Sequence, residues 1–169
     1  PGHRLTADLS YGRSEQDDPL LPYTVNPNLV VHTPVPLTVL NGKIDTTFAN
    51  LRYTGQLARR LSLTANYRYD DRDNGTPRAP YPYIGGDAQD QRPFEDARIN
   101  LPYSFTKHEA ELAARWRVAS ASRLKFGVEY ADISRTYMEV SDSDEWTGFV
   151  GYRFNGWEVT GFSVDWRRS

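Results

Sequence analysis

Few side chains in this sequence have the types and spacing that chemistry requires. The histidines are His3, His32 and His108, which lie far apart, and none has a second histidine three or four positions away. Paired ligands at such spacings are what most metal sites in proteins use. Cysteine is absent, so the chain has no thiolate metal site, no iron–sulfur cluster and no attachment point for haem c. We expect neither a metal nor a cofactor in this chain.

Two acidic segments come closer to a binding motif. Residues 71–75, DRDNG, resemble the start of an oxygen-rich calcium loop, but the distal bidentate Glu of such a loop is missing. Asp142, Asp144 and Glu145 form a second acidic cluster. Solvated or capped turns account for both segments, and we expect turns there.

Acid/base catalysis has one candidate pair, Glu109 and Glu111. Their spacing places both carboxylates on one face of a strand, roughly 7 Å apart from the strand rise. Arg115 and Arg117 follow on the same parity, which is more typical of a charged wall than of an active site. The sequence also lacks a glycine-rich phosphate loop and a nucleophile elbow. We expect the chain not to be an enzyme.

The segments that carry these charges alternate with a period of two. In residues 57–73, LARRLSLTANYRYDDRD, apolar side chains occupy one parity from Leu61 to Tyr69 and polar ones occupy the other. That is the period of a β-strand. The same alternation predicts seven strands, within residues 3–13, 43–57, 61–70, 106–118, 124–138, 145–154 and 157–168.

Three details of this prediction depend on local signals. Residues 106–118 fit a helix equally well in isolation, because Thr106 and Glu109 would make a capping box. Asn155-Gly156 predicts a two-residue type I′ turn. The apolar parity changes before Phe162, which predicts a bulge near Thr160 or Gly161. Phe48 is an apolar exception on the polar parity of its strand.

The lengths of the connections alternate as well. Long connections cover residues 14–42 and 71–105, whereas residues 58–60, 119–122 and 141–144 make short or moderate turns. In an up-and-down antiparallel sheet, the short turns then lie at one end, as in outer-membrane barrels with short periplasmic turns and long external loops. Strands of about ten residues also suit a tilted crossing of a bilayer. This arrangement favours a strand at 106–118.

A soluble β-sandwich or barrel would alternate in the same way. Two features favour lipid: the opposite parity is rich in charge, and Tyr and Trp cluster toward strand ends, as interfacial girdles do. A balance of 20 basic and 22 acidic side chains argues against a nucleic-acid binder. No run of 18 apolar residues exists for a membrane-spanning helix. We therefore predict an all-β, antiparallel, up-and-down transmembrane β-barrel fold, with residues 1–169 as a segment of one barrel domain.

Four blocks of the sequence resemble a known family. They are YGRSEQDDPLLPYTVNP (11–27), LNGKIDTTFANLRYTGQL with LSLTANYRYDDRDNGTP (40–77), NLPYSFTKHEAELAARWRV (100–118) and FGVEYADISRTYMEVSDSDEWT (126–147). In combination they are similar to the decahaem-associated outer-membrane β-barrels of the MtrB/PioB type. Segments such as NYRYDDRDN, with RTYMEV downstream, make the resemblance to this family specific. The four blocks together cover nearly the whole chain.

The resemblance implies a function in the bacterial outer membrane. Barrels of this family sheathe a periplasmic multihaem c-type cytochrome, so that electrons cross the membrane to or from an extracellular partner, which can be a second multihaem cytochrome. Haem c would be carried by the partner, and this chain would insulate it from outer-membrane lipid. Two alternatives remain open: a solute porin or transport channel, and a soluble β-domain that binds a ligand through its long loops.

The charged parity is the candidate partner-contact surface, because it lines the lumen if the apolar parity faces lipid. A water-filled pore wall would use the same residue types. The candidate residues are Arg52, Asn66, Arg68, Glu109, Glu111, Arg115, Arg117, Lys125, Glu129 and Arg153.

Seven strands are fewer than the eight of the smallest bacterial barrels, and open edges are not tolerated in lipid. We therefore expect strands outside these 169 residues to complete the barrel. A polypeptide of these residues alone should not form a closed monomeric pore in lipid vesicles. Planar-bilayer conductance checks this, and steady single-channel currents from the purified monomer would contradict it.

Overall fold

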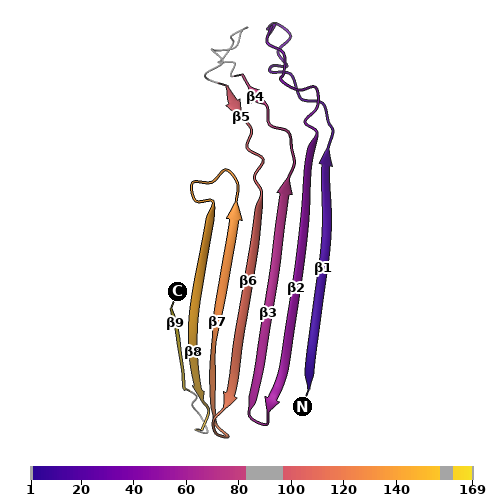
Figure 1. Cartoon of the computed structure of the whole chain (residues 1–169). Helices are drawn as coiled ribbons and strands as arrows, with labels where there is room; N and C mark the ends of the chain where they lie inside the picture. Colours follow the sequence, from indigo (N-terminus) through magenta and orange to yellow (C-terminus); the bar gives the residue numbers. More distant parts are fainter. Residues whose placement is uncertain (1, 83–96, 157–161, 169) are drawn as a thin grey trace. The chain divides into compact units, whose positions relative to one another are not determined.

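The computed structural model describes residues 2–82, 97–156 and 162–168, and the described residues form strands and connections without a helix (Figure 1). A seven-stranded sheet has the order β1-β2-β3-β6-β7-β8-β9, with neighbouring strands antiparallel. The strands are β1 (His3–Gln16), β2 (Gly42–Ala58), β3 (Leu61–Asn74), β6 (Phe105–Arg117), β7 (Ser122–Arg135), β8 (Asp142–Phe154) and β9 (Phe162–Arg168). Apart from the pair of short strands in the second long connection, every strand lies beside its neighbour in the chain. The predicted all-β, up-and-down order is confirmed.

The chain divides into two compact units. The first contains residues 1–11, 46–71 and 105–169, and the second contains residues 12–45 and 72–104. In the second unit, the short strands β4 (Pro80–Tyr81) and β5 (Arg98–Ile99) pair with each other, and Pro19 bridges to Val39. Arg13 and Asp45 form an ion pair there, with Nε to Oδ1 at 2.6 Å. The charged face predicted from the sequence belongs to the first unit.

Residues 105–117 form the strand β6, so the helical alternative for residues 106–118 is wrong. β6 pairs with β7 without interruption from Phe105↔Arg135 to Arg117↔Arg123. The Ala, Glu and Leu content of β6 favours a helix only weakly, by tenths of a kcal/mol per residue. Pairing with β7 on one side and with β3 on the other satisfies the backbone groups of the segment and overrides that preference.

The strands are longer than the ten residues expected: β6 and β8 have 13 residues, β7 has 14 and β2 has 17. β1 and β3 run on to Gln16 and Asn74, so both long connections are shorter than predicted. The segment DRDNG was predicted to be a turn, but residues 71–74 belong to β3. Its Asp71 accepts a hydrogen bond from the Thr106 hydroxyl at 2.7 Å, so pairing with the next strand outweighs local turn propensity.

The hairpin between β7 and β8 lies earlier than predicted. β7 ends at Arg135, so it does not continue to Met138, and Asp142 already pairs with Ser134. The Arg135 amide donates to the Ser141 carbonyl at 2.7 Å and closes the loop. Inside the loop, Tyr137 has a φ of 57°, a left-handed conformation that interrupts strand pairing.

The prediction of a two-residue turn at Asn155-Gly156 is also wrong. Phe154 pairs with Phe162, whereas a two-residue turn would pair it with Trp157. The Asn155 amide instead donates to the Ala121 carbonyl at 2.9 Å, in the neighbouring turn. The bulge predicted near Thr160 or Gly161 lies outside the described residues.

The described residues have almost no apolar core. In the first unit the buried apolar side chains are Ala113 and Phe149. They lie in one row across three strands, Ala113↔Gly127↔Phe149. A Cβ atom on Gly127 would meet the Leu112 carbonyl oxygen and lie 2.6 Å from Cζ of Phe149. Gly127 therefore leaves the space that the Phe149 ring occupies.

Gly127→Ala should lower the free energy of unfolding in lipid vesicles by about 1–3 kcal/mol, the usual cost of overpacking. The backbone oxygen of Leu112 cannot move away without breaking the β6–β7 ladder. Urea titration followed by tryptophan fluorescence measures the effect. Gly148→Ala is the matched control, because a Cβ atom there meets nothing within 4 Å. Equal effects of the two substitutions would refute this account of Gly127.

Candidate functional site

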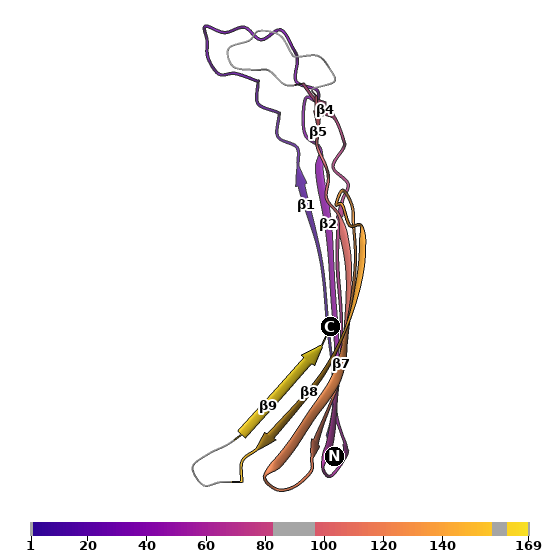
Figure 2. The same ribbon diagram turned by 90° about the vertical axis from the view of Figure 1, so that its left-hand side faces the viewer.

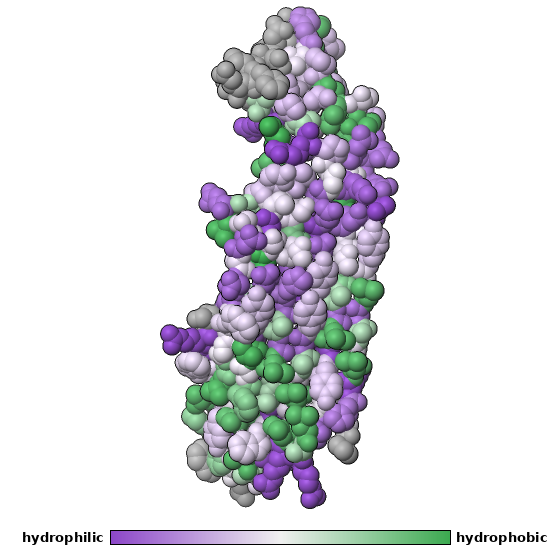
Figure 3. All heavy atoms as spheres, in the orientation of Figure 1, coloured by the Kyte–Doolittle hydropathy of each residue, from purple (hydrophilic) through white to green (hydrophobic). Residues whose placement is uncertain are grey.

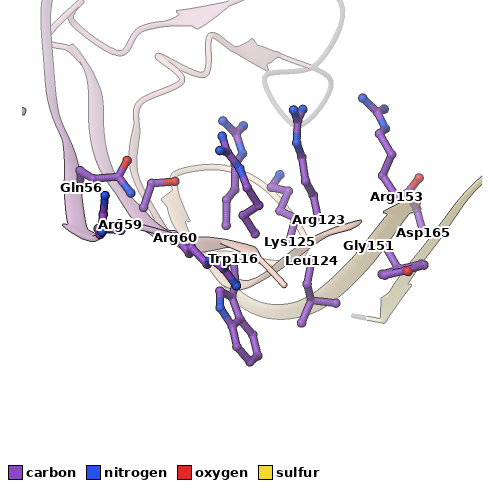
Figure 4. A pocket seen from close by; sticks show the side chains of 14 residues that line it. Gln56, Arg59, Arg60, Trp116, Arg123, Leu124, Lys125, Gly151, Arg153 and Asp165 are labelled. Carbon is purple, nitrogen blue, oxygen red and sulfur yellow. The ribbon is translucent and has the colours of Figure 1, made fainter. Parts of the chain in front are cut away.

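The sheet of the first unit has one apolar and one charged face. The register aligns Trp116, Leu124 and Tyr152 in one row across β6, β7 and β8. The next row toward the turns contains Arg117, Arg123 and Arg153. Figure 4 shows Trp116 and Leu124 pointing to one side of the sheet and Arg123, Lys125 and Arg153 pointing to the other. The predicted separation of apolar and charged parities onto two faces is therefore present in the structure.

The apolar face is exposed rather than packed against a second layer. Trp146 is 61% exposed, Trp166 55% and Leu112 49%. Figure 3 shows the apolar side chains gathered in a band near the short turns. The exposed members from β6 to β9 are Leu112, Trp116, Phe126, Val128, Trp146, Val150, Tyr152, Phe162, Val164 and Trp166. A soluble β-sandwich would bury such a face in its core, whereas a barrel wall turns it to lipid.

The band has a defined height along the strands. Its last apolar row is Ala110↔Tyr130↔Trp146, and the next row on this face is His108↔Asp132↔Asp144. From Ala110 to Val118 the chain has the nine or so residues that a tilted strand needs to cross a bilayer. The rings of Tyr130 and Trp146 lie 4.6 Å apart at this edge, in the position of an interfacial girdle.

His108 belongs to the same aromatic edge. Its Nδ1 lies 2.8 Å from the Tyr67 hydroxyl, and its ring lies 5.1 Å from that of Tyr69. His3 is arranged similarly, with Nδ1 2.7 Å from the Tyr53 hydroxyl. Among the described residues no group of three histidines, cysteines or carboxylates is placed to hold a metal ion.

The acidic cluster at the β7–β8 hairpin makes local hydrogen bonds. The Ser141 hydroxyl donates to the Asp142 carboxylate at 2.7 Å. This bond, with one from Ser134 and the charge of Arg135, holds the pKa of Asp142 below its ordinary value. A hairpin is present here as predicted, but Asp142, Asp144 and Glu145 lie in β8 and not in its turn.

The ten predicted contact residues all line hollows on the charged face of the first unit, and they fall into three groups. Arg52 lies in a hollow of 400 Å³ with Arg4, Thr6, Asp8, Asn50 and Thr54. Asn66, Arg68, Glu109, Glu111 and Glu129 line a second hollow of 390 Å³. Arg115, Arg117, Lys125 and Arg153 line a third, of 550 Å³ (Figure 4). This placement puts them on one surface, and their contact role stays a prediction.

Two carboxylates of the middle group, Glu109 and Glu129, form ion pairs. The Lys107 ammonium lies 2.7 Å from Glu109, and the Arg68 guanidinium lies 3.8 Å from the same carboxylate. Glu129 pairs with Arg167 at 3.2 Å. Both signs of charge therefore occur on this part of the face. Glu109 has its partners on its own strand and on the neighbouring β3, whereas the partner of Glu129 lies two strands away, on β9.

The sequence analysis missed several residues of the charged face. Arg123, Glu145 and Arg167 line the hollows but were not selected, although the alternation of their strands already indicates their parity. Phe149 was also missed. It lies on the charged face under the Lys125 ammonium, 4.5 Å from the ring centroid. Phe48, the apolar exception of its strand, has the Arg68 guanidinium 5.2 Å from its ring centroid. Both of these aromatic rings therefore make a cation–π interaction.

Comparison with known proteins agrees with this arrangement. The profile of a family described as "Putative outer membrane beta-barrel porin, MtrB/PioB" matches residues 1–169. A curated relative, "Outer membrane protein MtrB" of Shewanella baltica (strain OS185), is 26% identical over 155 residues. The match covers 92% of this chain and 21% of the relative, so the chain spans about a fifth of the length of that protein.

Leu112→Arg should lower the free energy of unfolding in lipid vesicles by about 1–3 kcal/mol, because it puts a charge inside the apolar band, one row from its edge, where the cost is below that at the bilayer midplane. Glu111→Arg is the matched control: it lies at the same depth on the other face, opposite Glu129, and should be nearly neutral. Urea titrations of both variants of the full-length protein measure the difference. If the two substitutions cost the same, the assignment of the faces is wrong.

Proposed function

The chain belongs to the MtrB/PioB family of outer-membrane β-barrels, and on this premise we propose that it forms part of a barrel wall around a multihaem c-type cytochrome. The barrel would hold that cytochrome in place and insulate it, so that electrons cross the outer membrane. The family is a barrel family and not an enzyme family. In this proposal the chain performs no chemistry of its own.

The described sheet supplies one sector of such a wall. β1 and β9 are its edges in the strand order, and an edge cannot remain unpaired in lipid because its backbone groups have no water to bond. We propose that further strands close the barrel. Within the first unit, Figure 2 shows the short-turn ends of β7, β8 and β9 displaced progressively from one another, so this part of the sheet is curved, as a barrel wall requires.

The observation that carries the proposal is the charged face. It extends across the strands of the first unit, opposite the apolar band, and it presents cations and carboxylates that are half-buried or exposed. Exposed charges of both signs give orientation and specificity to a docked protein. The proposal therefore assigns Arg52, Asn66, Arg68 and the other candidate residues to contacts with the enclosed cytochrome.

The two faces of the wall have different roles in insulating the enclosed cytochrome. In this proposal the apolar band faces lipid and the charged face holds the partner, so the wall between them keeps lipid away from the cytochrome. Haem c belongs to the partner in this proposal, since the chain has no cysteine for covalent attachment. An extracellular multihaem cytochrome at the mouth of the barrel would complete the electron path.

A solute channel is the second candidate function, and the description of the family as porins favours it. The same charged wall would then face water and pass ions or small polar solutes. The content of the lumen distinguishes the two functions, because a channel stays open and a sheath is filled.

The full-length protein, purified in mild detergent from cells that make it, should retain a haem-containing protein in a near one-to-one ratio. The expected readout is a c-type haem absorbance that co-elutes with the barrel, together with low ion conductance in planar bilayers. A haem-free barrel with open-channel conductance would support the porin and refute the sheath.

A further inference from the structure

The charged face separates its charges along the strand axis. Toward the short turns it is basic, with Arg115, Arg117, Arg123, Lys125 and Arg153, which we call the basic rows. Farther along the strands come Glu109, Glu111, Glu129 and Glu145, the acidic rows. Four residues separate Arg115 from Glu111, roughly 13 Å at the rise of a strand. That distance exceeds the screening length of about 8 Å at physiological ionic strength, so the two ends do not neutralise each other.

The register places like charges side by side in the basic rows. Arg117 is opposite Arg123, Arg123 is opposite Arg153, and Arg115 is opposite Lys125. Directly opposed side chains have Cβ atoms about 5 Å apart, and like charges in this position destabilise a sheet. Folding of the chain alone gives no reason for three adjacent arginines in one row.

The cations of the basic rows have no carboxylate to neutralise them. Within the described part of the chain, none of Arg115, Arg117, Arg123, Lys125 and Arg153 forms an ion pair. Asp165 is the one described carboxylate that lines their hollow. By contrast, Glu109 and Glu129 of the acidic rows are paired with Lys107, Arg68 and Arg167. Glu111 and Glu145 form no ion pair among the described residues either, so this face has unpaired positive charge at the short-turn end and unpaired negative charge farther along the strands.

We infer that the basic rows dock an acidic surface of the protein enclosed by the barrel. The inference rests on the proposed function and adds the sign and position of the contact. Guanidinium groups bind carboxylates in a planar, two-pronged geometry, and here they are exposed and spread over β6, β7 and β8. A row this wide matches a protein surface with several carboxylates. Because positive charge is confined to one end, the contact also sets which end of the partner enters that part of the lumen.

The test uses the full-length barrel with its co-purifying haem protein. Arg117→Gln with Arg123→Gln removes two cations of the basic rows and leaves the apolar band unchanged. We expect affinity for the haem protein to fall roughly three- to tenfold at physiological salt, given the usual strength of exposed ion pairs. The partner should also elute at a lower salt concentration. The matched control, Arg78→Gln with Arg98→Gln, removes the same charge from the connection between β3 and β6.

The outcomes separate this inference from the proposed function. Weaker retention in the Arg117/Arg123 variant, with normal amounts of barrel in the membrane and retention unchanged in the control, supports the inference. Equal retention by wild type and variant at every salt concentration overturns it while the proposed function stands. Equal retention with altered anion conductance also overturns it, in favour of a site for small anions. A wild-type barrel without any haem protein overturns the proposed function itself.

Discussion

The cross-strand register of β6, β7 and β8 is the constraint on which the properties of this protein depend. Pairing is unbroken from Phe105↔Arg135 to Arg117↔Arg123 and from Ser122↔Phe154 to Ser134↔Asp142. Because side chains alternate between faces, a slip of one residue would exchange the faces of a whole strand. The register therefore keeps apolar and charged side chains on opposite faces of these strands as far as the row of Ala110, Tyr130 and Trp146. It also forces like charges together, as at Glu111↔Glu129, which is tolerable only on a surface that meets water or a charged partner.

The apolar band covers only part of each strand. Beyond Ala110, Tyr130 and Trp146 the same face carries His108, Asp132 and Asp144, which lipid would not accept. Strands of 13 or 14 residues thus extend past the bilayer on the side of the β7–β8 hairpin. The hydrogen bonds of Asp142, Ser141 and Arg135 close the hairpin in that watery region, where polar capping is effective.

Aromatic rings have different roles on the two faces. On the apolar face, Tyr67, Tyr69, Tyr130 and Trp146 mark one edge of the band. On the charged face, Phe48 and Phe149 lie beneath cations, with Arg167 as a second cation 5.7 Å from the Phe149 centroid. A ring under a guanidinium or ammonium group restricts that side chain and attracts it. Phe149 also fills the space above Gly127, so one residue stabilises the sheet and positions its charges.

The sequence by itself determined the all-β class, the order of the strands and the face of every candidate residue from Arg52 to Arg153, because a period of two needs only local alternation. It did not determine where strands end. Asp71 and Asp142 have turn propensity, yet both lie in strands: Asp71, within β3, accepts a hydrogen bond from the Thr106 hydroxyl, and Asp142, in β8, pairs with Ser134. Only the tertiary structure decided which residues face each other across strands. The partners of Phe149, the pairing of Phe154 with Phe162 and the row of Arg117, Arg123 and Arg153 all depend on register, which is set by contacts between segments distant in the chain.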